Sequence, residues 1–212
     1  MTDVHTHLRD KTLAVRQLVI GEDFLGLHPW EAQGWTKDYA EGLDKALSAN
    51  PALGVGEIGL DRLKTREISA CQREAFLGQL RLAAFYHRPV VLHGAKCWGE
   101  VVKLLQPFAA EIPVMLFHGF SRSAGLLVEI DRLDGLISVG AAVMNDHAVN
   151  YRELVKAIPL SRLVLETDRT SENSSSIPPL GEIAAAVAKL KGIALAELEA
   201  LTDANARRLY AF

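Results

Sequence analysis

Short apolar runs alternate with longer amphipathic stretches along most of the chain. Seven apolar runs predict buried β-strands, at residues 3–8, 24–28, 52–58, 90–93, 113–118, 135–140 and 163–168. The stretches between and after them have the apolar spacing of helices, at residues 31–48, 67–86, 98–108, 123–132, 151–157, 180–191 and 195–210. Apolar strands that alternate with helices are typical of a parallel sheet covered by helices.

The region between His7 and His28 breaks this alternation. Only about a dozen residues separate His7 from Val19, and a parallel crossover needs roughly that many for its helix alone. The segment therefore has room for one short helix or one short strand, and an eighth strand near residues 15–20 lacks the clear pattern of the other seven. We expect the apolar cluster at residues 13–20 to pack as an irregular segment at the resulting gap.

Two parallel-sheet architectures are compatible with this order of elements. An open doubly wound sheet that binds nucleotides carries a glycine-rich phosphate loop after its first strand, and the sequence has none there. The chain has 212 residues, at the lower end of the size of a (β/α)₈ barrel. We predict one domain over residues 1–212, a TIM-type α/β barrel of seven regular strands with one N-terminal βα unit shortened or missing.

Composition narrows the environment of the protein. Hydrophobic residues make up 49% and charged residues 23%, and the net charge of −3 argues against a surface that coats long nucleic acids. Cys71 and Cys97 form no CxxC motif or disulfide framework, which favours a reducing compartment. The sequence starts in a strand pattern without a secretory leader, and no apolar run is long enough to span a membrane. We expect a cytoplasmic protein with no membrane partner; the oligomeric state stays open, and a monomer is compatible with the sequence.

Six ionisable side chains lie at or near the ends of the predicted strands. His5 and His7 share one face of the first strand, since residues i and i+2 point the same way. Four more close later apolar runs: Glu57, His93, His118 and Asp168. In a barrel the carboxyl ends of all strands point to one mouth, where these side chains would converge. Four imidazoles and two carboxylates suit two divalent ions of the zinc, manganese or magnesium type.

Each of these residues also has a simpler interpretation. Glu57 could cap the following turn, His93 and His118 could be hydrogen-bonded core histidines, and Asp168 could cap a helix. Taken singly, each simpler interpretation is the better one. Taken together, six ionisable groups at one barrel mouth would be costly to desolvate unless they are paired or bound to metal.

Cationic and aromatic residues follow the candidate ligands along the chain. The cations are Arg9, Arg62, Lys64, Lys96, Arg122 and Arg169. Of these we assign Lys96, Arg122 and Arg62 to substrate binding, together with His28. For the cations the alternative is exposure to solvent or pairing with Glu67 or Glu172, and for His28 it is a structural role. Trp30 and Trp98 could stack on a base, although packing in the core or at the rim is the simpler interpretation of either. An acidic protein with a cationic mouth suits a small or terminal phosphate substrate.

Several motifs in order carry a resemblance to one protein family. DVHTHL, GLHPW, GVGEIGLD, RPVVLHGAKCW, FHGFSRS and LVLETD span nearly the whole chain. With this set the chain resembles the TatD family of metal-dependent deoxyribonucleases, which are amidohydrolase-like barrels. The resemblance implies that His5, His7, Glu57 and Asp168 hold one metal and that Glu57, His93 and His118 hold the other. It also implies hydrolysis of phosphodiesters, typically DNA from its 3′ end, so the expected partner is a DNA end or a small phosphodiester.

The chain departs from the family pattern in three places. Residues 7–28 are short by about one strand-helix unit, Arg62 replaces the usual aromatic residue after GLD, and Arg-Thr-Ser-Glu follows LETD in place of Ala-Pro. These differences fall near the expected site and could change the preferred substrate.

A metal-bound water would supply the nucleophile in this interpretation. Water held by divalent cations is acidic enough to ionise near neutral pH. Asp168 could accept its proton and return it to the leaving oxygen, and Glu57 would bridge the two ions. Two alternatives stay open: a metal-dependent hydrolase of a small ester, lactone or amide, and an inactive barrel retained for binding.

Overall fold

The computed structural model describes residues 1–64, 66–121 and 124–210. Within them, eight strands form one sheet in the order β2-β1-β8-β7-β6-β5-β4-β3, and every pair is parallel. The strands are β1 Thr2–Thr6, β2 Arg16–Val19, β3 Phe24–Leu25, β4 Gly54–Asp61, β5 Val90–Ala95, β6 Met115–Phe117, β7 Leu136–Val139 and β8 Leu163–Leu165. A parallel bridge between Ile20 and Phe24 joins the two ends of the sheet. The predicted TIM-type barrel is therefore confirmed, and it is nearly closed.

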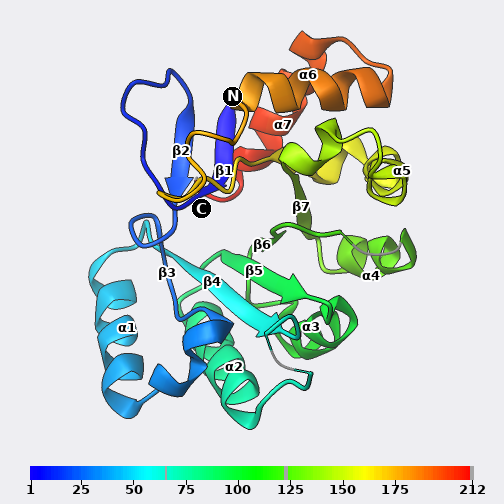
Figure 1. Ribbon diagram of the computed structural model, residues 1–212. Coiled ribbons are helices and arrows are strands. Elements are labelled where there is room, and N and C mark those ends of the chain that lie inside the picture. Colours follow the sequence, from blue (N-terminus) through cyan, green and yellow to red (C-terminus); the bar gives the residue numbers. More distant parts are fainter. Residues whose placement is uncertain (65, 122–123, 211–212) are drawn as a thin grey trace.

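Helices cover most of the barrel wall. They are α1 Lys37–Ala49, α2 Ala70–Phe85, α3 Trp98–Leu105, α4 Leu127–Arg132, α5 Val149–Ala157, α6 Leu180–Lys191 and α7 Leu195–Arg207. Figure 1 shows α1, α2 and α3 grouped beside β4 and β5, and α5, α6 and α7 on the opposite side. The predicted helix at 31–48 is divided at Thr36, whose hydroxyl caps α1 by accepting a hydrogen bond from Tyr39 N, and a 3₁₀ helix, η1, covers Pro29–Gly34. No helix in the described part of the chain is long and apolar enough to cross a membrane.

The expectation of only seven regular strands is wrong. β2 pairs with β1 from Thr2 opposite Arg16 to Thr6 opposite Val19, so the eighth strand is present. The connection through residues 7–15, all of which are described, contains no helix, and Figure 1 shows a loop at this position outside β2. The segment between His7 and His28 has room for one short helix or one short strand, and it forms the strand β2. The first units are shortened by the loss of their helices, while the strands needed for closure remain.

Side chains replace the missing helices at the edge of β2. The guanidinium of Arg9 donates to the carboxylates of Glu22 at 2.7 Å and Asp23 at 2.8 Å, and to the main-chain oxygen of Gln17 at 3.3 Å. The Asp23 carboxylate also accepts a hydrogen bond from Val19 N at 2.8 Å. These contacts satisfy polar groups that an open strand edge would leave unpaired.

The C-terminal helix covers the same region on its apolar side. Leu18 of β2 belongs to a buried cluster with Val4 of β1 and with Ala206 and Leu209 at the end of the chain. The Arg16 guanidinium lies 3.8 Å from the centroid of the Tyr210 ring. Leu18 and Val19 are therefore buried, as expected, although in a strand, whereas Leu13 lies before β2 and is 39% exposed.

Two buried glutamines of α2 fix the main chain next to the candidate site. Gln79 accepts a hydrogen bond from Leu27 N at 2.6 Å and donates to Leu27 O at 3.2 Å. Gln72 pairs in the same way with the main chain of Asp61, at 3.0 and 3.2 Å. The side-chain amides thus take the place of a neighbouring strand, and they hold the residue before His28 and the end of β4 in position.

Candidate metal centre

Four of the six predicted ligands form one compact group at the carboxyl end of the barrel. His5 Nε2 lies 3.2 Å from His7 Nε2, and each nitrogen lies 3.5–3.6 Å from Glu57 Oε2 and from Asp168 Oδ1. A tetrahedral zinc ion with ligands at about 2.0–2.1 Å has ligand atoms about 3.3–3.4 Å apart. The nitrogens of His5 and His7 and a Glu57 oxygen all lie within 4.8 Å of one another, which suits a divalent metal, and Asp168 Oδ1 lies beside the two imidazoles.

Hydrogen bonds between β1 and β8 hold this group together beyond the ends of the strands. Asp168 N donates to His5 O at 3.0 Å, and His7 N donates to Arg169 O at 2.8 Å. Thr167, the residue before Asp168, is held by the buried carboxylate of Asp3, which accepts hydrogen bonds from Thr167 N at 2.9 Å and Thr167 Oγ1 at 2.6 Å. The two histidines and Asp168 are therefore positioned by paired main chain, although Asp168 itself lies after the last strand.

The second predicted group centres on the other oxygen of Glu57. Glu57 Oε1 lies 2.7 Å from His93 Nδ1, 3.7 Å from His118 Nε2 and 3.8 Å from His28 Nε2. Burial alone would raise the pKa of Glu57, but the neighbouring His118 and His93 rings lower that pKa well below its usual range. At 2.7 Å, Glu57 and His93 share a hydrogen bond, so a metal at this group has to displace the proton between them.

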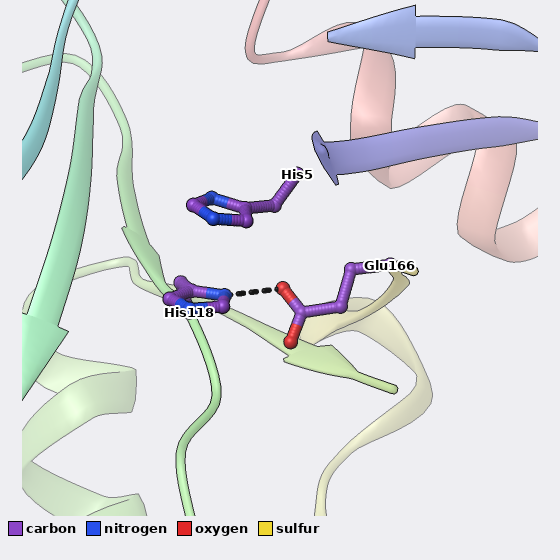
Figure 2. Close-up of side chains that lie close together, drawn as sticks. All are labelled: His5, His118 and Glu166. Carbon is purple, nitrogen blue, oxygen red and sulfur yellow. Dashed lines mark hydrogen bonds and ion pairs between the residues drawn. The ribbon is translucent and has the colours of Figure 1, made fainter. Parts of the chain in front are cut away.

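Glu166 orients His118 and was not identified from the sequence. Figure 2 shows the His118 ring stacked on His5 and linked to Glu166, with 2.7 Å between His118 Nδ1 and Glu166 Oε2 and 3.6 Å between the ring centroids. The bond leaves Nε2 of His118 facing the other ligands. Burial lowers the pKa of His118, but Glu166 and Glu57 more than offset that effect and raise it to about 10. Glu166 precedes Asp168 by two residues, and this spacing was the available signal.

Asp61 is a second supporting carboxylate that the sequence analysis missed. Its Oδ2 lies 2.9 Å from His93 Nε2 and accepts a hydrogen bond from Trp30 Nε1 at 2.8 Å. It is fully buried at the end of β4, which continues three residues beyond the predicted end of that strand at residue 58. The longer strand brings Asp61 to the barrel mouth.

A cavity of about 450 Å³ opens over both groups. His28 lines it, as predicted, and so does Trp30, which is 53% exposed. Trp98, the other candidate for base stacking, is buried against Phe117 and Phe120 and therefore serves packing.

The predicted cations have different surroundings. Lys96 is exposed and lines a neighbouring cavity of about 440 Å³ that also reaches His93 and His118. Arg62 is exposed and is not among the residues that line either cavity, whereas Lys64 lies over the Trp30 ring. Arg122 lies outside the described residues.

Comparisons with known proteins agree with this geometry. The sequence matches the family described as TatD related DNase over residues 2–211. It is 32% identical over 197 residues to the 3′-5′ ssDNA/RNA exonuclease TatD of Klebsiella pneumoniae, covering 87% of this chain and 75% of that protein. It is 28% identical over 195 residues to the uncharacterized metal-dependent hydrolase YabD of Bacillus subtilis, covering 88% and 76%. The crystal structure of YJJV, a TatD homolog from Escherichia coli K12, superposes with a TM-score of 0.75 at 26% identity, covering 89% of this chain and 76% of that one. The chain belongs to the TatD related DNase family and is a divalent-metal-dependent hydrolase.

Proposed function

We propose that the protein hydrolyses phosphodiester bonds at the 3′ end of single-stranded nucleic acid. The observation that carries this proposal is the pair of donor groups that share Glu57, one oxygen in each, beneath an open cavity. Carboxylate-bridged pairs of divalent ions are used for the displacement of phosphoryl groups. The relative from Klebsiella pneumoniae carries the activity of a 3′-5′ ssDNA/RNA exonuclease in its name, which supports the same substrate class here.

The proposed cofactor is two divalent ions, zinc, magnesium or manganese. His5, His7, Glu57 and Asp168 would hold the first, and Glu57, His93 and His118 would hold the second. When bound, the ions supply an acidic water molecule as nucleophile and polarise the phosphoryl oxygen. Glu57 is 4% exposed, and its two oxygens face the two groups.

Asp168 is the proposed proton acceptor. Its side chain is half exposed at the cavity, and its Oδ1 faces His5 and His7 while its Oδ2 lies 4.0 Å from His118 Nε2. Burial raises the pKa of Asp168, but the hydrogen bond with His5 and the charge of His118 outweigh it and keep the carboxylate ionised. Cys97 is buried and donates to Leu60 O at 3.1 Å, which excludes it as the nucleophile.

Substrate contacts are assigned to His28 and Lys96. His28 Nδ1 accepts a hydrogen bond from Trp30 N at 3.2 Å, so in the neutral ring the proton is on Nε2, which points toward Glu57. His28 therefore presents a donor suited to a phosphate oxygen. Lys96→Ala should raise KM more than it lowers kcat, because a phosphate contact outside the metal groups supplies binding in ground and transition state alike. We also propose that the protein works in the cytoplasm, where its free thiols Cys71 and Cys97 would stay reduced.

The proposal is tested with single-stranded DNA labelled at either end, in parallel with single-stranded RNA, duplex DNA and a small ester. Each substrate is incubated with zinc, magnesium or manganese and again with chelator. Stepwise shortening from the 3′ end that stops on chelation is the expected result. Hydrolysis of the ester without cleavage of any nucleic acid would overturn the proposal.

A further inference from the structure

Trp30 is an exposed aromatic side chain inside the cavity that covers the candidate metal groups. Its side chain is 53% exposed, and its ring centroid lies 6.4 Å from that of the candidate ligand His93. An indole ring that is exposed beside a cluster of polar side chains is typical of a binding site. At this distance, if a phosphate of the substrate lies at the candidate metal ligands, the base of the same or the next nucleotide can reach the indole.

Contacts at its edges hold the indole ring in place. Trp30 Nε1 donates to the buried Asp61 carboxylate at 2.8 Å, and Trp30 N donates to His28 Nδ1 at 3.2 Å. The His28 ring packs edge-on to the indole, with 4.7 Å between centroids and 80° between planes. The ring is thus fixed before any ligand arrives, which reduces the entropy lost on binding.

A cation accompanies the ring. Lys64 Nζ lies 3.7 Å from the centroid of the Trp30 ring, over its face. An aromatic face with a neighbouring cation is the combination that single-stranded nucleic acids require, because bases stack on the ring and the backbone phosphate binds the cation.

We propose that Trp30 and Lys64 form a nucleotide subsite at the rim of the metal cavity. In this subsite a nucleobase next to the scissile bond displaces the Lys64 ammonium from the face of the indole and stacks there, and the ammonium contacts the adjacent backbone phosphate. The proposal deepens the proposed function and rests on it for the identity of the substrate. Since every base has an aromatic face, the subsite favours an unpaired strand without selecting its sequence.

The first experiment compares binding of oligothymidylate with binding of the same strand carrying abasic residues at its 3′ end. Both strands have phosphorothioate linkages to prevent turnover, and affinity is measured with the metal-loaded protein, for wild type, Trp30→Phe and Trp30→Leu. Removing the terminal bases should weaken binding to the wild type by roughly 5- to 140-fold. It should have a smaller effect on Trp30→Phe, and no effect on Trp30→Leu. Equal discrimination by the wild type and Trp30→Leu would overturn the stacking role.

Matched controls separate stacking from damage to the site. Phe85→Leu removes an aromatic side chain that is 75% exposed on α2, and it should bind both strands as the wild type does. Metal content of Trp30→Leu should equal that of the wild type, which shows that Asp61 still supports His93. If the wild type cleaves no unprotected strand, the proposed function fails, whereas the abasic comparison still decides the subsite.

The second experiment measures the salt dependence of binding. Lys64→Ala should reduce the slope of log affinity against log salt concentration by about 0.7, the value for one phosphate contact on a single strand. Lys45→Ala, an exposed lysine on α1, is the control and should leave the slope unchanged. A wild-type slope in Lys64→Ala would remove Lys64 from the subsite.

Discussion

Glu166→Gln tests whether the orientation of His118 matters for metal binding. Glu166 is 3% exposed, and its two oxygens serve two donors, His118 Nδ1 at 2.7 Å and Gly119 N at 3.2 Å. Glutamine keeps one acceptor oxygen and places an amide donor against the other partner, so one hydrogen bond and the negative charge are lost. Losing such a partner of a metal-binding histidine lowers metal affinity by about 10- to 100-fold, or roughly 1.4–2.7 kcal/mol.

The assay is competition between the protein and a chromophoric chelator, with circular dichroism to confirm that the variant is folded. The Glu166→Gln variant should release its more weakly bound ion at a chelator concentration that leaves the wild type loaded, and its kcat should fall in parallel. Glu197→Gln, an exposed position at the start of α7, serves as the control. Wild-type affinity for both ions in Glu166→Gln would show that His118 is not a ligand or does not need its partner.

Three further results are expected. Binding of the second ion should release about one proton, the one shared between His93 and Glu57. Glu57 and Asp61 raise the pKa of His93 against the effect of burial, and below that pKa the affinity for the second ion should increase up to tenfold per pH unit. Calorimetry in buffers of different ionisation enthalpy measures the number of protons released. Gln79→Leu should lower the free energy of unfolding by roughly 2–4 kcal/mol in urea titration, because it leaves two buried main-chain groups unpaired, and an unchanged midpoint would contradict the role of this amide. Burial raises the pKa of Cys97 to about 11, so at pH 8 a disulfide reagent should titrate the exposed Cys71 rapidly and Cys97 only on unfolding; two fast thiols would refute this.

The barrel and its six candidate ligands could be predicted because both are encoded by local pattern. A strand that is buried on both faces is an apolar run, and a ligand at its carboxyl end is a polar residue that closes the run, as with His93 and His118. Neither feature requires knowledge of distant contacts. The ring of strands then brings the candidate ligands together by geometry alone.

The short N-terminal region was harder, because long-range pairing decides its structure. β2 exists because β1 supplies a partner and because Arg9 and Asp23 satisfy its open edge, and neither contact is visible in residues 13–20 themselves. An apolar segment without a following helix carries no periodicity that separates a strand from irregular packing.

The supporting carboxylates were missed for a related reason. The roles of Asp61 and Glu166 are visible in their contacts with His93, on the adjacent strand β5, and with His118, which follows β6 and is separated from β8 by β7. The alternation that identified His5 and His7 would have found Glu166 two residues before Asp168, had it been applied to every strand. Asp61 was missed because the apolar run at residues 52–58 predicts a strand that ends at residue 58, whereas β4 extends to Asp61.

Elemental analysis of the purified protein, combined with activity before and after chelation, tests the central claim most directly. The account predicts about two divalent ions per chain in the wild type and at most one in Glu57→Ala, which lacks the shared carboxylate. Phosphodiesterase activity should disappear with the metal and return on its replacement. Full activity in protein shown to be free of metal, or an unchanged metal content in Glu57→Ala, would contradict the account.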